Sequence, residues 1–407
     1  MRIARIEVRH SVAVPLGVGL ALLEAWLLAS RTASWAGRWT LLAVLLRVSL
    51  LAVCPLAVTA GAWLGGRDRR AGVRDLFAST PRPAWQPTVL SWATITSVAC
   101  LGMLAPLLVT AVLVGRVATY PGGGWWWTAG IAFVAVGAAT ACGLAVGRLV
   151  PTWVIAPIAG TVAFFGLLMV NPEENAAGWA ALSPVVAFTS ETEVHSVSFQ
   201  LWQAAWLLAL TAVLLAVAVP GRRFAGPLAT GGAALALVMV PQLAGSSFTA
   251  LRQDPDAAAL VCTGSGPTVC VTRANAYLLA AVAGRVQPML GRLAGIPGAP
   301  TRAVDATADP RNDARRDTVW LSLSDMSTVD GRLSSDYSPS TDFAGVVYGN
   351  CPSAFDEAVF PLAERAGRIL EDDAPLADPA VRAWLGDYLT AVDRCDHAAL
   401  LALARRP

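Results

Sequence analysis

Seven predominantly apolar stretches, each about 18 residues or longer, occupy most of the first 249 residues of this chain. They run roughly over 11–30, 40–64, 89–115, 126–148, 152–170, 201–219 and 227–248. A helix needs about 20 predominantly apolar residues to cross the hydrocarbon core of a bilayer. The sequence therefore predicts an all-α polytopic membrane domain with about seven transmembrane helices.

The distribution of charge divides the chain into two parts. Residues 1–249 contain 8 acidic and 15 basic residues, whereas residues 250–407 contain 20 acidic and 15 basic residues. About a quarter of the residues of an ordinary soluble domain are charged, a level that only the second part approaches. We therefore predict a transmembrane domain over 1–249 and a separate water-soluble domain over 250–407.

The arginines predict how the first part is oriented, because cytoplasmic loops of membrane proteins carry an excess of basic residues. With the N-terminus in the cytoplasm, eleven arginines fall in cytoplasmic segments and three, Arg31, Arg38 and Arg116, fall in the outer loops. Seven crossings then place the second domain outside the cytoplasm. The expected location is the cell membrane, with a cytoplasmic N-terminus and an extracytoplasmic C-terminal domain.

The cysteines fit this partition. Three of the seven lie in predicted spans, where small packing roles are expected, and the other four are Cys262, Cys270, Cys351 and Cys395. An even number of cysteines outside the cytoplasm favours disulfides, and we expect a local Cys262–Cys270 bond and a longer Cys351–Cys395 bond. A metal site is the weaker alternative, since no CxxC pair occurs and only His397 is near a tail cysteine.

The outer domain has a mixed pattern that predicts an α+β fold. Leu260–Cys262, Thr268–Val271 and Thr318–Leu323 have strand character, and Asn275–Leu293 has helical character. A further helix is expected after Asp378, because the proline that follows it suits a first helical position. Its apolar residues at helical spacing are interpreted as core.

No constellation of catalytic residues stands out. The sequence has no HExxH, no GxSxG and no GxGxxG after a strand, and it has no lysine, which excludes a conventional P-loop ATPase. His10 and His195 are expected to be solvated, and Asp305–Asp317 is expected to be a polar loop without calcium-site spacing. We predict no enzymatic activity, no metal, no cofactor in this chain and no nucleic-acid partner.

Two ionisable residues lie within predicted spans. Glu24 and Arg47 are each expected about 10 Å below the outer surface, at the same depth in neighbouring spans. Charges inside a membrane are costly and usually pair or line a polar path. The favoured interpretation is an ion pair that braces the first two spans, and the alternatives are a role in a substrate path or snorkelling toward the interface.

The cytoplasmic loop between the second and third spans, residues 66–83, is charged and can form a short helix. Its basic residues alone suit contact with anionic lipid head groups. Acidic residues and an apolar pair within the same segment favour docking on a protein surface instead. The candidate docking residues are Arg67, Asp68, Arg69, Arg70, Arg74, Asp75, Leu76 and Phe77.

This layout of an amphipathic start over Arg2–Arg9, two spans, the charged loop and four further spans resembles an ABC-2 type transporter permease, over about residues 1–220. The longer outer segment Asn171–Gln200 also resembles that family, whereas a seventh span and an outer domain depart from its usual six-span core. The resemblance implies the membrane subunit of an exporter, paired with a like or unlike membrane subunit. It further implies a cytosolic ATP-binding partner that carries ATP and Mg and docks on the 66–83 loop. A membrane-anchored extracytoplasmic binding, sensing or resistance protein is the main alternative, and a polytopic enzyme is another.

Overall fold

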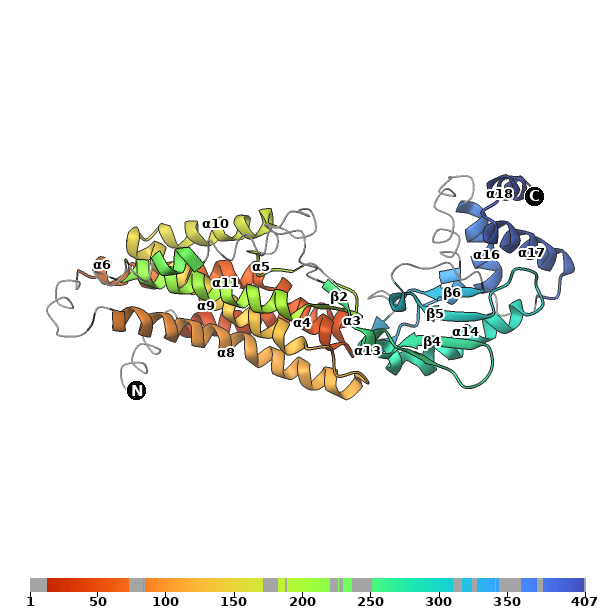
Figure 1. Cartoon of the computed structure of the whole chain (residues 1–407), viewed down its shortest axis with the longest axis horizontal. Coiled ribbons are helices and arrows are strands. Elements are labelled where there is room, and N and C mark those ends of the chain that lie inside the picture. Colours follow the sequence, from red (N-terminus) through yellow and green to blue (C-terminus); the bar gives the residue numbers. More distant parts are fainter. Residues whose placement is uncertain are drawn as a thin grey trace.

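A computed structural model of the chain shows an elongated molecule with a helix bundle at one end and an outer domain at the other (Figure 1). The structure describes residues 13–72, 83, 85–170, 182–186, 189–219, 226, 230–235, 251–309, 317–323, 328–340, 342–343, 360–371 and 376–405. The short helix α6 (Arg67–Arg70) lies at the end of the bundle that faces away from the outer domain (Figure 1). The two ends of the bundle therefore carry the charged loop and the outer domain, respectively.

Seven helices make up the described bundle. They are α2 (Ala13–Ala29), α4 (Trp39–Val48), α5 (Leu50–Gly65), α8 (Trp85–Val117), α9 (Trp125–Leu149), α10 (Ile155–Met169) and α11 (Val197–Ala218). In the described residues, four segments are long and apolar enough to cross a membrane: Leu50–Arg70, Trp85–Val117, Trp125–Leu149 and Val197–Ala218. Helices α2, α4 and α10 are apolar but shorter. The chain is thus a membrane protein, as the apolar stretches predict, and the predicted second span is two helices rather than one.

The predicted seventh span, 227–248, lies mostly outside the described residues. Only residues 230–235 of this span are described, and they are helical. The described residues on either side of it are far apart. Helix α11 begins two residues after strand β1 (Glu193–His195) and its 22 residues carry the chain about 33 Å away from that strand. Strand β2 (Leu251–Gln253) pairs with β1, so Ala218 and Leu251 lie near opposite ends of α11.

Helix α9 is the centre of the bundle and packs against α5, α11, α4, α8 and α10. Glycines allow its close approach to α5: a Cβ atom on Gly143 or Gly147 would collide with the backbone of α5, and one on Gly61 or Gly65 would collide with the backbone of α9. Small residues spaced four apart commonly bring membrane helices together in this way. Packing of backbone against backbone therefore positions α5 and the helix α4 that precedes it.

Apolar side chains also cover the outside of the bundle. Large hydrophobic residues of α8, α10 and α11 are exposed, among them Leu101, Val109, Val162, Phe165 and Leu208. A soluble protein rarely exposes a continuous apolar surface of this kind, whereas lipid tails cover it at no cost. The outer surface therefore agrees with a bundle that sits in a bilayer.

The outer domain is built on a four-stranded sheet in the order β3 (Leu260–Cys262), β4 (Thr268–Thr272), β5 (Arg302–Asp305) and β6 (Thr318–Leu321). Strand β3 is antiparallel to β4, whereas β4, β5 and β6 are parallel. The chain crosses from β4 to β5 through η2 (Arg273–Leu278) and α14 (Leu279–Leu293). The predicted mixture of helices and strands is confirmed, but the parallel strands make this an α/β arrangement rather than the expected α+β one.

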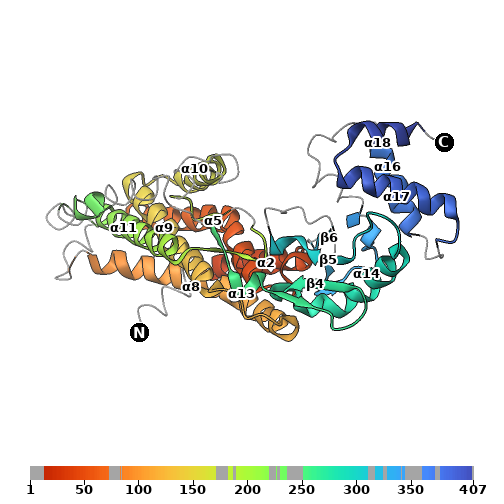
Figure 2. The same cartoon turned by 45° about the vertical axis from the view of Figure 1, so that its right-hand side comes forward.

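One hydrophobic core joins the sheet, α14 and the C-terminal helices α16 (Phe360–Glu371), α17 (Pro379–Asp393) and α18 (His397–Ala404). Figure 2 shows the sheet between these three helices and the bundle. Asp378 caps α17 by accepting a hydrogen bond from the backbone N–H of Ala380, and Leu385 and Tyr388 of that helix are buried. The predicted helix start and its apolar core face are both confirmed.

Candidate functional site

Arg47 is fully buried inside the bundle. Its Nε and Nη2 atoms donate to the carbonyl oxygen of Pro184 at 2.8 and 2.6 Å, and Nη2 also donates to Oε1 of Gln203 at 2.7 Å. Its Nη1 atom is buried without an acceptor. Among the described residues no carboxylate pairs with this guanidinium, so its charge is stabilised only by neutral acceptors. Such burial of an unpaired charge costs several kcal/mol.

Glu24 of α2 is also fully buried. The hydroxyl of Ser49 lies 3.1 Å from its Oε1 atom, and its Oε2 atom has no partner. Ser49 is the single residue between α4 and α5, and it keeps helical dihedral angles with φ of −61° and ψ of −20°, so this contact lies where the two helices of one long apolar segment meet.

Glu24 and Arg47 do not form the ion pair that their predicted depth suggested; each has its own neutral partner. The reason is helical geometry, because residues two apart in a helix point to nearly opposite sides. Ser49 meets Glu24 on the side of α2, while Arg47 reaches toward α11 and Pro184. Two separate polar contacts therefore flank the point where α4 and α5 meet.

The polar surroundings of Arg47 come from α11 and from the segment that precedes it. Gln203 is fully buried and donates from Nε2 to the carbonyl oxygen of Ser183 at 2.6 Å. Gln200, one turn earlier on the same face, donates to the carbonyl oxygen of His195 at 3.1 Å and has a buried Oε1 atom without a partner. Arg47 and Gln203 together hold the carbonyl groups of residues 183 and 184 against the bundle interior.

His195 is 7% exposed and stacks on Phe199 with ring centroids 5.6 Å apart, which corrects the expectation of a solvated side chain. Burial, and secondly the positive charge of Arg47, lower the pKa of His195 to about 4. The imidazole is therefore neutral near pH 7 and does not add charge to the surroundings of Arg47.

A second buried arginine, Arg38, joins the bundle to the outer domain. It lies one residue before α4 and is 2% exposed. Its Nη2 atom is 3.2 Å from Oε1 of Glu191 and donates to the carbonyl oxygen of Leu323 at 2.8 Å, and its Nε atom donates to Oδ1 of Asn275 at 3.1 Å. Burial raises the pKa of Glu191 although the charge of Arg38 opposes that rise. We call Arg38, Glu191, Asn275 and Leu323 the junction.

The junction lies where the parallel strands of the outer sheet end. Asp305, the last residue of β5, is fully buried. Its Oδ2 atom accepts hydrogen bonds from the side chain of Asn275 at 2.9 Å and from the hydroxyl of Thr272 at 2.8 Å, and its Oδ1 atom accepts from the hydroxyl of Thr307 at 2.8 Å. Asp305 therefore holds Asn275 in position to accept from Arg38. It belongs to a buried network and not to the polar loop expected from the sequence.

In open α/β sheets, ligands bind at the carboxyl ends of parallel strands. Here that position receives the guanidinium of Arg38, which the membrane part of the same chain supplies. The outer domain thus binds the bundle through the part of its sheet that usually faces a ligand.

Further contacts hold this orientation. The hydroxyl of Tyr277 donates to the carbonyl oxygen of Ala36 at 3.2 Å, and Gly37 has a φ of 82°, a value that glycine adopts readily. A Cβ atom on Gly37 would lie 2.7 Å from the ring of Tyr277. Between the α8–α9 loop and the start of the outer domain, the hydroxyl of Tyr120 donates to Asp254 at 2.6 Å. The pairing of β1 with β2 adds backbone hydrogen bonds to the same interface.

The predicted docking residues are only partly within the described chain. Arg67, Asp68, Arg69 and Arg70 form α6, and none of these four is buried. Arg67 and Asp68 are 3.5 Å apart, and Arg70 lies over the ring of Trp63 at 4.9 Å. Arg74, Asp75, Leu76 and Phe77 lie outside the described residues.

The disulfide Cys262–Cys270 is confirmed, and it joins residues that lie opposite each other on β3 and β4. Cys395 takes part in a disulfide, and its predicted partner Cys351 lies outside the described residues. Cys54, Cys100 and Cys142 of the bundle are free thiols. No cluster of three or more His, Cys, Asp or Glu residues suited to a metal occurs in the described part of the chain.

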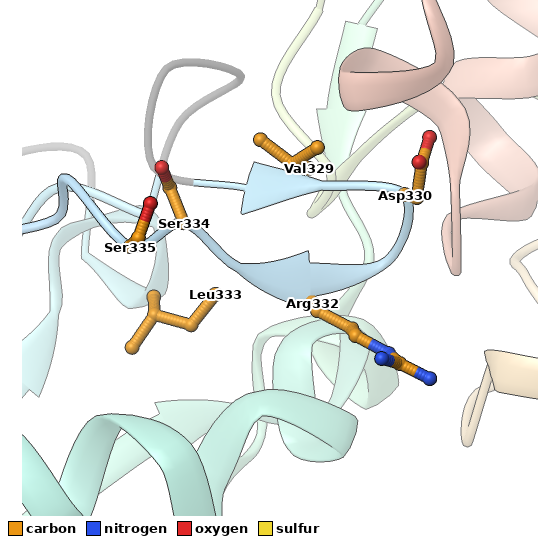
Figure 3. A pocket seen from close by; sticks show the side chains of 6 residues that line it. All are labelled: Val329, Asp330, Arg332, Leu333, Ser334 and Ser335. Carbon is orange, nitrogen blue, oxygen red and sulfur yellow. The ribbon is translucent and has the colours of Figure 1, made fainter.

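A surface hollow of about 550 Å³ lies beside the hairpin of β7 (Thr328–Val329) and β8 (Arg332–Leu333). The turn of this hairpin, Asp330–Gly331, has positive φ at both residues and packs near Ala36. Figure 3 shows that the side chains of Asp330 and Arg332 point away from Ser334 and do not converge. The hollow therefore lacks the convergent polar groups of a binding pocket.

Sequence reasoning found Glu24 and Arg47 but missed the junction. Arg38 was visible only as one of three arginines in the outer loops, and its partners Asn275 and Leu323 are 237 and 285 residues away in the chain. The available signal was the strand–helix–strand pattern over Thr268–Asp305, which is typical of parallel strands. Parallel pairing of these strands would have placed Thr272 and Asp305 together at the carboxyl ends of the strands.

Comparisons with protein families, with curated proteins and with solved structures found no match to this chain. Its function is therefore argued from the two buried arginines, Glu24 and the arrangement of the domains alone.

Proposed function

We propose that this chain is the membrane-spanning permease subunit of an ABC-2 type exporter, powered by a separate ATP-binding subunit that docks on the cytoplasmic 66–83 loop. The observation that carries the proposal is the pair of buried ionisable residues, Glu24 and Arg47, beside the point where α4 and α5 meet inside an apolar bundle. A bundle that only anchors a domain gains nothing from such costly groups, whereas a transport path requires polar groups within the membrane.

The junction supports a moving part rather than a passive anchor. Arg38, Thr192 and Thr328 all form hydrogen bonds between the outer end of the bundle and the outer domain. A domain held by several buried directional contacts follows the helices when they tilt. In this proposal ATP binding moves the 66–83 loop, α4 and α5 transmit the motion, and the outer domain moves with the outer end of α4. Seven transmembrane helices, a dimer of membrane subunits and an extracytoplasmic C-terminal domain belong to this proposal.

Copurification tests the proposal. The full chain, isolated from its native membranes in a mild detergent, should bring with it a protein with a P-loop ATPase sequence. Asp75→Arg and Phe77→Ala should release that protein, because both changes alter the docking loop without altering the spans. Asp336→Asn, an exposed position in the outer domain, is the matched control and should leave the complex intact.

An ATPase that never copurifies with the wild-type chain contradicts the exporter proposal. The outer domain would then be the functional part, as in a membrane-anchored sensing or resistance protein, and the buried charges of the bundle would need another explanation.

A further inference from the structure

The charge around Arg47 is not balanced by the residues that the structure describes. Its three hydrogen bonds go to the carbonyl oxygen of Pro184 and the side-chain oxygen of Gln203, both neutral acceptors. His195, a titratable group that senses its charge, is neutral at pH 7. Within the described part of the chain, the positive charge of Arg47 is therefore uncompensated.

The geometry leaves one edge of this guanidinium free. Nε and Nη2 both donate hydrogen bonds, which fixes the plane of the guanidinium group. Both hydrogens of Nη1 have no acceptor. A planar guanidinium with a free edge is suited to binding an oxyanion. Arg47 is nine residues along α4 from Arg38, or about 13 Å, and therefore lies in the outer half of the bundle.

Residues 182–186 contact the bundle through the carbonyl groups of Ser183 and Pro184, which Gln203 and Arg47 bind. Both are contacts of irregular backbone and not of a packed helix. They involve Nε and Nη2 of Arg47, and its Nη1 atom takes no part in them.

We infer that Arg47 is a binding residue for an oxyanion, a phosphate-type group of the molecule that the protein carries, which pairs with its free Nη1 edge. This inference rests on the proposed transport function and adds the chemical class of the substrate. The phosphate can belong to a lipid head group or to a free ion, and the two sources are distinguished by experiment.

The full chain in a neutral maltoside detergent provides the test. Binding of phosphatidylglycerol, phosphatidylcholine and inorganic phosphate is measured for the wild type, Arg47→Gln and Arg116→Gln. Arg116 is an exposed arginine at the outer end of α8 and serves as the matched control. Loss of a charge-assisted hydrogen bond predicts binding roughly tenfold to hundredfold weaker in Arg47→Gln. Arg116→Gln should bind like the wild type.

The probes separate the two sources. Binding of phosphatidylglycerol alone assigns a lipid head group, and binding of inorganic phosphate as well assigns the oxyanion itself. Equal binding by the wild type and Arg47→Gln overturns the inference, as does equal weakening in Arg116→Gln, which indicates a general surface attraction. Binding of none of the probes by the wild type also overturns it.

A second measurement needs no variant and covers the case in which Arg47→Gln does not fold. An anion on Nη1 neutralises the charge that depresses the titration of His195, so nuclear magnetic resonance should show His195 titrating at higher pH in the presence of saturating anion. Burial is the larger cause of the low pKa of His195 and the charge of Arg47 the second, so an unchanged titration overturns the inference once His195 is shown to sense that charge. A negative result in the anion-binding measurements does not affect the ATPase copurification experiment. A negative copurification result likewise does not affect anion binding, so the two proposals can be contradicted independently.

Discussion

Arg38 immediately precedes the short helix α4 and Arg47 lies near the end of that helix, and both are almost completely removed from solvent. Arg38, at the junction, has a carboxylate within 3.2 Å and acceptors from two elements of the outer domain. Arg47, inside the bundle, has only neutral acceptors among the residues that the structure describes. Within that part of the chain the first buried charge is balanced and the second is not.

The difference separates a structural role from a functional one. A balanced charge with several hydrogen bonds holds two parts of a molecule in one orientation, because any other arrangement leaves a buried carboxylate alone. An unbalanced charge makes its surroundings less stable, and a protein that retains one generally uses it to bind or transport. The comparison therefore predicts that substitution of Arg38 mainly lowers stability, whereas substitution of Arg47 mainly impairs binding or transport.

The largest expected effect is that of Arg38→Leu. This change leaves the buried Glu191 without its cation, so the free energy of unfolding should fall by about 3–5 kcal/mol. Arg47→Leu leaves neutral acceptors unpaired but also removes an unbalanced buried charge, so the two effects offset each other and the loss should be no more than about 1 kcal/mol. Equilibrium unfolding in detergent, followed by tryptophan fluorescence, measures both.

The double variant Arg38→Leu with Glu191→Leu provides the control. Removing both charges should restore most of the stability that Arg38→Leu loses, since no ionised group is then buried alone. If the double variant is as unstable as Arg38→Leu, packing and not charge makes the junction stable. If Arg47→Leu costs as much as Arg38→Leu, the distinction between the two arginines is wrong.

The second prediction concerns the backbone that presents Arg38. Gly37→Ala places a Cβ atom against the ring of Tyr277 and forces a side chain into a left-handed conformation, so it should destabilise the protein by about 1–3 kcal/mol. Gly19→Ala is the matched control, because Gly19 is exposed on α2 with open space around it and alanine there favours the helix by about 0.5–1 kcal/mol.

Thermal unfolding of both variants in the same detergent measures this effect. Equal melting temperatures for Gly37→Ala and the wild type would mean that the Ala36–Arg38 turn adjusts freely. The orientation of Arg38 would then come from its hydrogen bonds alone.

Features with local causes could be predicted from the sequence. The apolar stretches predicted the bundle helices within a few residues, the turn between Cys262 and Cys270 predicted their disulfide, and Asp378 predicted the start of α17. Each depends on residues that are close together in the chain. The interruption at Ser49 was missed because Ser49 keeps helical dihedral angles, and the one proline of Leu41–Leu64, Pro55, lies inside α5 and not at the interruption.

The partners of the buried charges could not be predicted, because they depend on how distant segments meet. Their equal predicted depth suggested that Glu24 and Arg47 should pair. In the structure, Glu24 lies on the side of Ser49, whereas the side chain of Arg47 extends to the opposite side of α4, toward α11. The burial of Glu191 and Asp305 depends on the outer sheet docking on the bundle. No local pattern in a single sequence specifies such a contact.

The last prediction concerns a difference in pH dependence between the two parts of the molecule. In the outer domain, burial raises the pKa of Asp342 to about 6, in spite of hydrogen bonds from the hydroxyl of Tyr337 and the N–H of Ser322. The folded chain therefore takes up a proton near pH 6 that the unfolded chain does not, and this group stabilises the fold as the pH falls through about 6. At the outer end of the bundle His195 has the opposite sign. Its pKa is about 4 when folded, so its contribution to stability is present above the unfolded pKa of about 6.5 and is lost as the pH falls toward 4.

Asp342→Asn and His195→Gln isolate these contributions when each variant is compared with the wild type at the same pH, because all other titrating groups then cancel. Between pH 7 and pH 4, the stability of His195→Gln relative to the wild type should rise, and that of Asp342→Asn should fall. If Arg47 contributes to the depressed titration of His195, the rise in His195→Gln should shrink in an Arg47→Gln background, where the imidazole is easier to protonate. A rise of the same size in both backgrounds would show that burial alone keeps His195 neutral, and that the charge of Arg47 is screened from its nearest titratable neighbour.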